Sequence, residues 1–80
     1  MSIVKGSIVK ARAGRDKDSF FVVLGVNDEF ALIADGKRRT PEHPKNKKLK
    51  HLEPTNTVIE GSFKTNPQIK KILNNFKNGG

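Results

Sequence analysis

The sequence contains no cysteine, and it contains no tryptophan or tyrosine. Without cysteine, the chain can form no disulfide or thiolate metal site and has no thiol nucleophile. Its apolar runs are far shorter than the roughly 18 residues of a membrane span, and its start lacks the apolar core of a signal peptide. These absences indicate a cytoplasmic protein.

Aromatic residues are limited to five phenylalanines, three of which fall in apolar, strand-like segments. Proteins that bind single-stranded nucleic acid stack bases on exposed aromatic rings. Grooves for proline-rich peptides and cages for methyl-lysine also need aromatic walls. The shortage of aromatic residues therefore argues against these three kinds of binding.

Basic residues dominate the charge of the chain. The 80 residues include 16 Lys and Arg against 8 Asp and Glu, which gives a formal net charge of +8. Such an excess resists self-association and favours polyanionic partners, namely nucleic acid or an anionic membrane. A chain of this length makes one domain with little volume for a deep pocket, so we expect a monomeric binding domain.

The first apolar segments are typical of β-strands. Segment 8–12 alternates apolar and basic residues, as a half-buried strand does, and its outer face carries Lys10 and Arg12. Segment 20–24 is a short, continuous apolar run, which predicts a central strand. Gly25 directly after this run predicts a bulge or sharp bend.

Further strands and turns are predicted beyond this point. Segment 30–34 predicts a strand, Asp35-Gly36 predicts a two-residue hairpin turn, and segment 37–40 predicts the returning strand. Pro41 and Pro44 indicate a loop, because proline cannot donate to a sheet ladder. Four or five short strands with tight turns predict a small, mainly β barrel.

The second half of the chain has fewer apolar residues. In segment 44–52 only Leu49 and Leu52 are apolar, which suits a short helical turn followed by a last short strand. In the tail, Asn66 can cap a helix and Pro67 suits its first position.

Apolar residues recur in the tail with the spacing of one helix face; they are Ile69, Ile72, Leu73 and Phe76. We therefore expect a barrel domain over residues 1–54, a connector over 55–65 and a C-terminal amphipathic helix over 66–77 that docks on the barrel.

Segment 6–23 (GSIVKARAGRDKDSFFVV) resembles a KOW motif: an alternating strand, a glycine at Gly14, a charged loop and a second strand. Segments 34–39 and 44–52 resemble a bacterial branch of KOW proteins that is similar to archaeal and eukaryotic large-subunit ribosomal proteins. The resemblance implies a five-stranded, antiparallel SH3-like barrel and RNA binding, often within ribosomes. Asp18 departs from the pattern, which has a second small residue there, often glycine.

Two basic clusters are candidate RNA contacts. One lies in the loop after the first strand, and the other, segment 37–51, has seven basic residues against the single acidic residue Glu42. Such runs are often only solvated surfaces, but like charges held this close destabilise a fold, which favours phosphate contact. The candidate RNA-binding residues are Arg12, Arg15, Lys17, Lys37, Arg38, Arg39, Lys45, Lys47, Lys48, Lys50 and His51.

Gly14 has two possible roles, which are compatible with each other. A glycine between a strand and a charged loop either supplies a positive φ angle or lets RNA approach the backbone closely.

We expect neither enzymatic activity nor a metal or other cofactor. His43 and His51 are the only imidazoles, and no thiol could share a metal with them. No serine or threonine has a histidine placed to activate it, and the chain has no glycine-rich phosphate loop.

The sequence therefore predicts a protein that binds structured RNA, with ribosomal RNA or the ribosome as the expected partner. The alternative is a protein-binding KOW module that contacts the transcription or translation machinery. A minor alternative is binding to a membrane surface through the C-terminal helix, where Lys70, Lys71 and Lys77 flank the apolar stripe.

Overall fold

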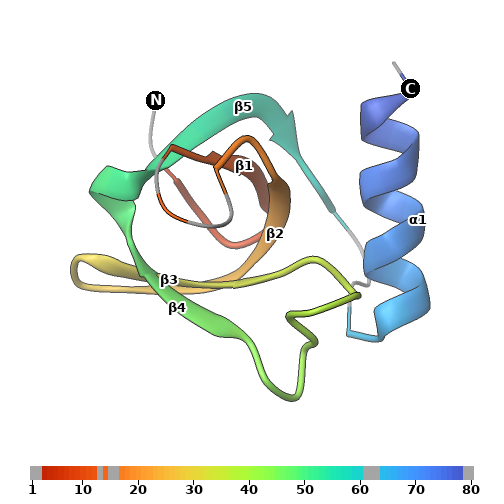
Figure 1. Cartoon of the computed structure of the whole chain (residues 1–80), viewed down its shortest axis with the longest axis horizontal. Helices are drawn as coiled ribbons and strands as arrows, with labels where there is room; N and C mark the ends of the chain where they lie inside the picture. Colours follow the sequence, from red (N-terminus) through yellow and green to blue (C-terminus); the bar gives the residue numbers. More distant parts are fainter. Residues whose placement is uncertain (1–2, 13, 15–16, 61–63, 79–80) are drawn as a thin grey trace.

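The computed structural model describes residues 3–12, 14, 17–60 and 64–78. The described residues form one antiparallel sheet with the strand order β4-β3-β2-β1-β5, followed by a helix (Figure 1). The elements are β1 (Ser7–Ala11), β2 (Phe20–Asn27), β3 (Phe30–Ala34), β4 (Lys45–Lys48), the 3-10 turn η1 (Leu49–His51), β5 (Leu52–Val58) and α1 (Asn66–Lys77). The predicted mainly β fold, a small SH3-like barrel with a C-terminal helix, is confirmed.

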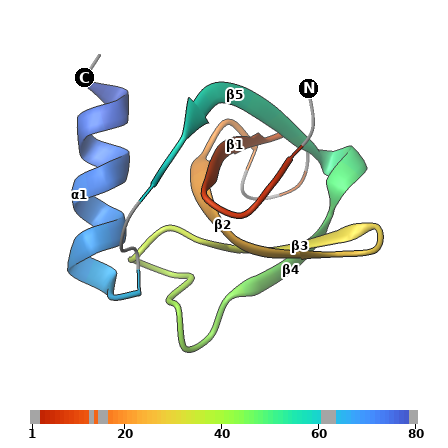
Figure 2. The same cartoon turned by 180° about the vertical axis from the view of Figure 1, so that it is seen from behind.

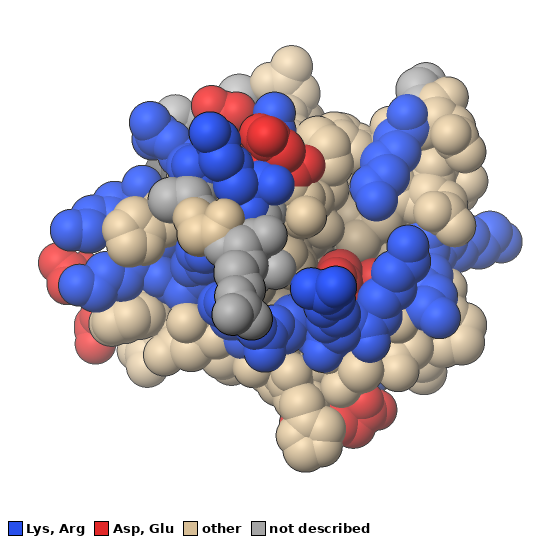
Figure 3. All heavy atoms as spheres, in the orientation of Figure 1, with Lys and Arg blue, Asp and Glu red and all other residues tan. Residues whose placement is uncertain are grey.

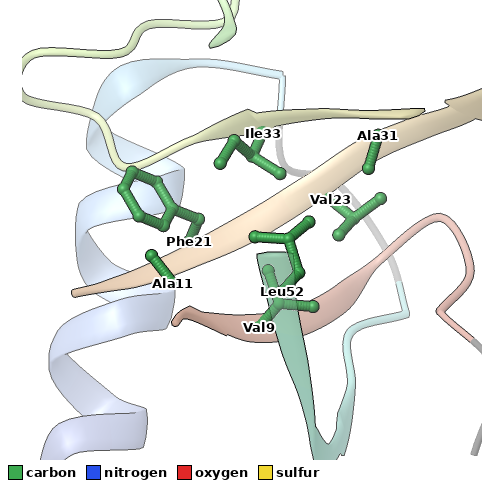
Figure 4. Close-up of a cluster of buried hydrophobic side chains, with 7 residues drawn as sticks. All are labelled: Val9, Ala11, Phe21, Val23, Ala31, Ile33 and Leu52. Atoms are coloured by element: carbon green, nitrogen blue, oxygen red, sulfur yellow. The ribbon is translucent and has the colours of Figure 1, made fainter. Parts of the chain in front are cut away.

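The inside of the barrel is filled by alternate side chains of the strands. Val9 lies opposite Phe21, and Val23 lies opposite Ile33, so the members of each pair share one face of the sheet. The inner core consists of Val9, Ala11, Phe21, Val23, Ala31, Ile33 and Leu52, all buried (Figure 4).

Helix α1 lies beside the barrel (Figure 2), and a second core lies between the helix and the outer face of the barrel. Ile8 and Val22, whose neighbours in sequence point inward, pack against Ile69 and Leu73 of the helix. Lys10 is partly exposed and Arg12 is exposed, as predicted for the outer face of segment 8–12, whereas Ile8 on this face is buried beneath the helix. Helix α1 thus packs on the barrel through Ile69 and Leu73.

The continuous apolar run at 20–24 is explained by these two cores. Phe21 and Val23 belong to the inner core, whereas Val22 belongs to the outer core and Phe20 and Leu24 pack against it. A strand buried on both faces needs apolar residues at every position.

Strand β2 has two further features: an aromatic contact with α1 and a register shift against β3. The Phe20 ring meets the Phe76 ring of α1 edge-on, with centroids 5.1 Å apart. The register of β2 against β3 shifts between Val23 and Gly25, which confirms the predicted bulge.

The predicted hairpin at Asp35-Gly36 is wrong, and segment 37–40 is not a strand. The Asp35 carboxylate accepts hydrogen bonds from the backbone N–H groups of Lys37 (2.8 Å) and Arg39 (3.0 Å). These bonds close a compact loop, because a short acidic side chain competes with the sheet ladder for backbone donors. The fourth strand is β4, in the segment predicted to lead into a helical turn.

Two boundaries also differ from expectation. β5 continues to Val58, so the barrel extends beyond residue 54 and into the predicted connector. The N-cap of α1 is Thr65 rather than Asn66: the Thr65 side chain accepts from the Gln68 N–H, and the Gln68 side chain accepts from the Thr65 N–H. This reciprocal capping box satisfies two helix-end donors. The predicted helical turn at Leu49 and the last strand after it are confirmed.

Candidate functional site

Two residues of the β1–β2 loop lie in the left-handed region of φ. Gly14 has φ +84° and Asp18 has φ +70°. Glycine adopts this region without strain, and aspartate tolerates it better than most residues. Asp18 thus has a backbone conformation that glycine adopts without strain.

Hydrogen bonds at the base of this loop fix its position on β1. The N–H groups of Asp18 and Ala11 donate to the carbonyl oxygens of Ala11 and Ser19, respectively, both across 2.9 Å. The N–H of Lys17 donates to the carbonyl oxygen of Gly14 across 3.2 Å. An ion pair of 3.5 Å joins Lys10 to Asp18, whose side chains are 37% and 69% exposed, and such a surface pair adds little stability.

The same loop is joined to η1. The Arg12 N–H donates to the carbonyl oxygen of His51 across 2.9 Å, and the side chains of Arg12, Lys50 and His51 are exposed. A Cβ built on Gly14 would lie 3.6 Å from Nζ of Lys47 in β4. Two basic segments that are separate in the sequence therefore meet.

We call this surface the basic rim and define it as Arg12, Gly14, Lys17, Lys47, Lys50 and His51. Figure 3 shows blue side chains gathered on the side of the molecule where η1 and the β1–β2 loop lie.

The lysines of β4 do not share one surface. Lys45 lies opposite Ile33 and Lys47 opposite Ala31, so both lysines are on the face of β4 that turns toward the inner core, and both are half-buried. Lys48, opposite Phe30, is on the other face and is exposed. Alternation along a strand imposes this separation.

Lys48 and Lys50 lie near acidic groups. Together with Asp28, Glu29 and Leu49 they line a hollow of about 280 Å³, and the Leu49 N–H donates to the Glu29 carbonyl oxygen across 2.8 Å. These carboxylates reduce the attraction of this part of the surface for polyanions.

Lys37, Arg38 and Arg39 form a further group of basic residues, in the β3–β4 loop that the hydrogen bonds of Asp35 close. Lys37 and Arg38 are exposed, whereas Arg39 is half-buried, and its Nε has no hydrogen-bond partner among the residues that the structure describes. The loop touches α1 at Gly36, where an added Cβ would lie 2.9 Å from the Asn66 carbonyl oxygen and 2.8 Å from Cγ of Lys70.

The predicted site residues thus separate into distinct places. The structure brings Arg12 and Lys17 together with Lys47, Lys50 and His51, and it places segment 37–39 beside the helix instead. Arg15 lies outside the described residues. The positive φ of Gly14 supports its conformational role.

Sequence reasoning missed an exposed apolar surface around Phe30. Val26 is 42% exposed and Leu32 is 41% exposed. With Phe30, Asn27 and other neighbours they line a hollow of about 280 Å³. The signal was Leu32, an apolar residue at an outward position of β3 that α1 does not cover.

Neither a metal centre nor a membrane-spanning helix is found in the described part of the chain. No group of three or more His, Cys, Asp or Glu side chains is placed to hold a metal ion there. No helix there is long and apolar enough to cross a bilayer.

The fold and the site define a class of protein: a five-stranded SH3-like barrel with a basic rim at its first loop. No protein-family model and no curated protein sequence matches the chain.

Proposed function

We propose that this protein binds structured RNA, with ribosomal RNA as the expected target, and that the basic rim contacts RNA phosphates. The observation that carries the proposal is the Arg12–His51 hydrogen bond, because it joins the cations of the β1–β2 loop to those of η1. Loops held by a rigid barrel are common binding sites. Several ammonium and guanidinium groups on one rim suit the closely spaced charges of a folded RNA backbone.

The positions of the phenylalanines favour folded over single-stranded RNA. Phe21 is buried, and the half-buried Phe20 ring packs edge-on against Phe76 and lies 6.0 Å from Nζ of Lys10, so neither ring is fully exposed. Recognition by shape and phosphates needs no stacked bases. The role that we propose is non-enzymatic, cytoplasmic and independent of cofactors.

The KOW resemblance gives the proposal independent support. Gly14 and Asp18 both have a positive φ, the backbone region that glycine populates most readily. Membership of the family remains part of the proposal.

The test is a titration followed by fluorescence anisotropy at several salt concentrations. The ligands are a folded ribosomal RNA domain, an RNA duplex and an unstructured strand of equal length. We expect the folded RNA to bind most tightly and the logarithm of its affinity to fall linearly with the logarithm of salt concentration. Equal affinity for all three RNAs, or an affinity that does not change with salt concentration, contradicts the proposal.

A second candidate function, a protein-binding module of the transcription or translation machinery, is favoured by the exposed apolar surface at Val26, Phe30 and Leu32. Contiguous apolar surface of this kind often marks a protein contact. Replacement of Leu32 by Asp would abolish such a contact without affecting RNA affinity. The membrane alternative loses support, because Ile69 and Leu73 are 0% and 3% exposed and the apolar stripe faces the barrel.

A further inference from the structure

A cationic groove runs between α1 and the barrel. It is a hollow of about 230 Å³ whose apolar residues are Phe20 and Leu73. Lys37 lines it on the barrel side, and Lys70 and Lys77 line it on the helix side. Figure 3 shows basic side chains on both the barrel and the helix of this face.

The helix periodicity places the polar residues of one wall in a row. Lys70, Asn74 and Lys77 all line the groove, and their spacing of i, i+4 and i+7 puts them on one side of a helix. This side adjoins the stripe of Ile69 and Leu73 that is buried against the barrel. Because the helix docks on the barrel in this orientation, Lys70 and Lys77 lie along the groove between helix and barrel.

The opposite wall is held close by Gly36. An added Cβ at this residue would overlap Cγ of Lys70 at 2.8 Å, so the β3–β4 loop and the first turn of α1 are in direct contact. The backbone of Lys37, the next residue, is thereby held near the helix lysines, and its side chain lines the groove.

The groove has an excess of unpaired positive charge. Lys37, Lys70 and Lys77 form no ion pair within the part of the chain that the structure describes. Asp35 is the acidic residue of the lining, and its carboxylate already accepts the N–H groups of Lys37 and Arg39. Ser19 and Asn74 add neutral hydrogen-bond donors to the lining.

We propose that this groove holds the phosphodiester backbone of bound RNA and forms a second contact region beside the basic rim. The inference rests on the proposed function and deepens it, because it assigns the C-terminal helix to the RNA interface. Three ammonium groups from two elements, with neutral donors among them, match consecutive phosphates. Phosphate contacts carry no sequence information, so we expect contact without sequence preference.

The test compares two double variants of the full chain that change the net charge equally. Lys70→Gln with Lys77→Gln removes the helix side of the groove. Lys64→Gln with Lys71→Gln is the matched control, because Lys64 and Lys71 are exposed and do not line the groove. Lys71 is rotated by about 100° around the helix from Lys70.

Affinity for an RNA duplex of about 16 base pairs is measured across salt concentrations, and thermal unfolding verifies that each variant is folded. We expect the groove variant to bind roughly tenfold more weakly at low salt and to lose about 2 from its salt slope, with the control nearly unchanged. Equal losses of RNA affinity in the groove variant and the control would contradict the proposed groove contact, because they would show only an effect of net charge. If the groove variant binds normally while the rim variant Arg12→Gln with Lys50→Gln is impaired, the groove is refuted and the proposed function stands. Absence of RNA binding by the unaltered protein refutes both.

Discussion

The backbone N–H of Arg12 donates a hydrogen bond of 2.9 Å to the carbonyl oxygen of His51. This bond forms where β1 ends and η1 leads into β5, whose first residue, Leu52, pairs with Ala11. It places the exposed side chain of Arg12 beside the segment that carries Lys50. The basic rim thus depends on strand pairing between the first and the last strand of the barrel.

Removal of two charges from the rim should weaken RNA binding. For Arg12→Gln with Lys50→Gln we expect a salt slope smaller by about 2 and an unchanged melting temperature, because both side chains are exposed. Anisotropy titrations at several salt concentrations measure the slope. Lys5→Gln with Lys71→Gln serves as control, since both of these lysines are exposed and neither belongs to the rim or the groove. An equal change of the salt slope in the control would contradict the proposal that the basic rim contacts RNA.

Gly14→Ala should lower the free energy of unfolding by about 1–3 kcal/mol, because a side chain at φ +84° is strained. Urea unfolding measures this change. Gly25→Ala is the control: Gly25 has no positive φ, and a Cβ there would meet no atom within 4 Å. If Gly14→Ala keeps full stability but loses RNA affinity, the glycine serves close RNA approach instead.

Gly36→Ala should be more damaging than Gly14→Ala. Its φ is +78°, and the added Cβ would also overlap the Asn66 carbonyl oxygen at 2.9 Å. Strain and steric overlap together predict a loss of at least about 2 kcal/mol in the free energy of unfolding. Hydrogen exchange should become faster in the first turn of α1, where loop and helix would separate. Unaltered exchange there would show that the loop contact does not hold the helix.

Ile69→Ala tests the outer core. Ile69 is fully buried against β1 and β2, so we expect a loss of about 2–5 kcal/mol in the free energy of unfolding. Asn75→Ala, an exposed change on the same helix, should alter it by less than about 0.5 kcal/mol. Amides from Ile69 to Phe76 should exchange slowly in the free protein. Fast exchange there would mean that the helix docks only when a partner is bound.

Local sequence patterns correctly predicted the elements whose structure depends on interactions between residues close in the chain. The apolar run at 20–24 and segment 30–34 form strands, Gly25 marks the bulge, and the spacing from Ile69 to Phe76 forms the amphipathic helix. In each case side-chain periodicity or glycine geometry acts over a few neighbouring residues. The net charge likewise follows directly from composition.

The sequence alone misled where one polar side chain decides between two local structures. Asp35-Gly36 is a common hairpin signal, yet the Asp35 carboxylate binds two backbone N–H groups and forms a loop instead. The strand expected at 37–40 is therefore replaced by β4, in which three of four residues are lysines. Such a strand has no apolar pattern to reveal it, and pairing with β3 stabilises it.

Tertiary structure alone decided how the charges are grouped. Composition made the protein basic, but the pairing of β1 with β5 brought Arg12 to His51, and alternation along β4 put Lys47 and Lys48 on opposite faces. Docking of α1 buried the outer side of Ile8 and aligned Lys70 and Lys77 with Lys37. These relations join residues far apart in the chain, and they are fixed by packing and by strand register, which no local pattern encodes.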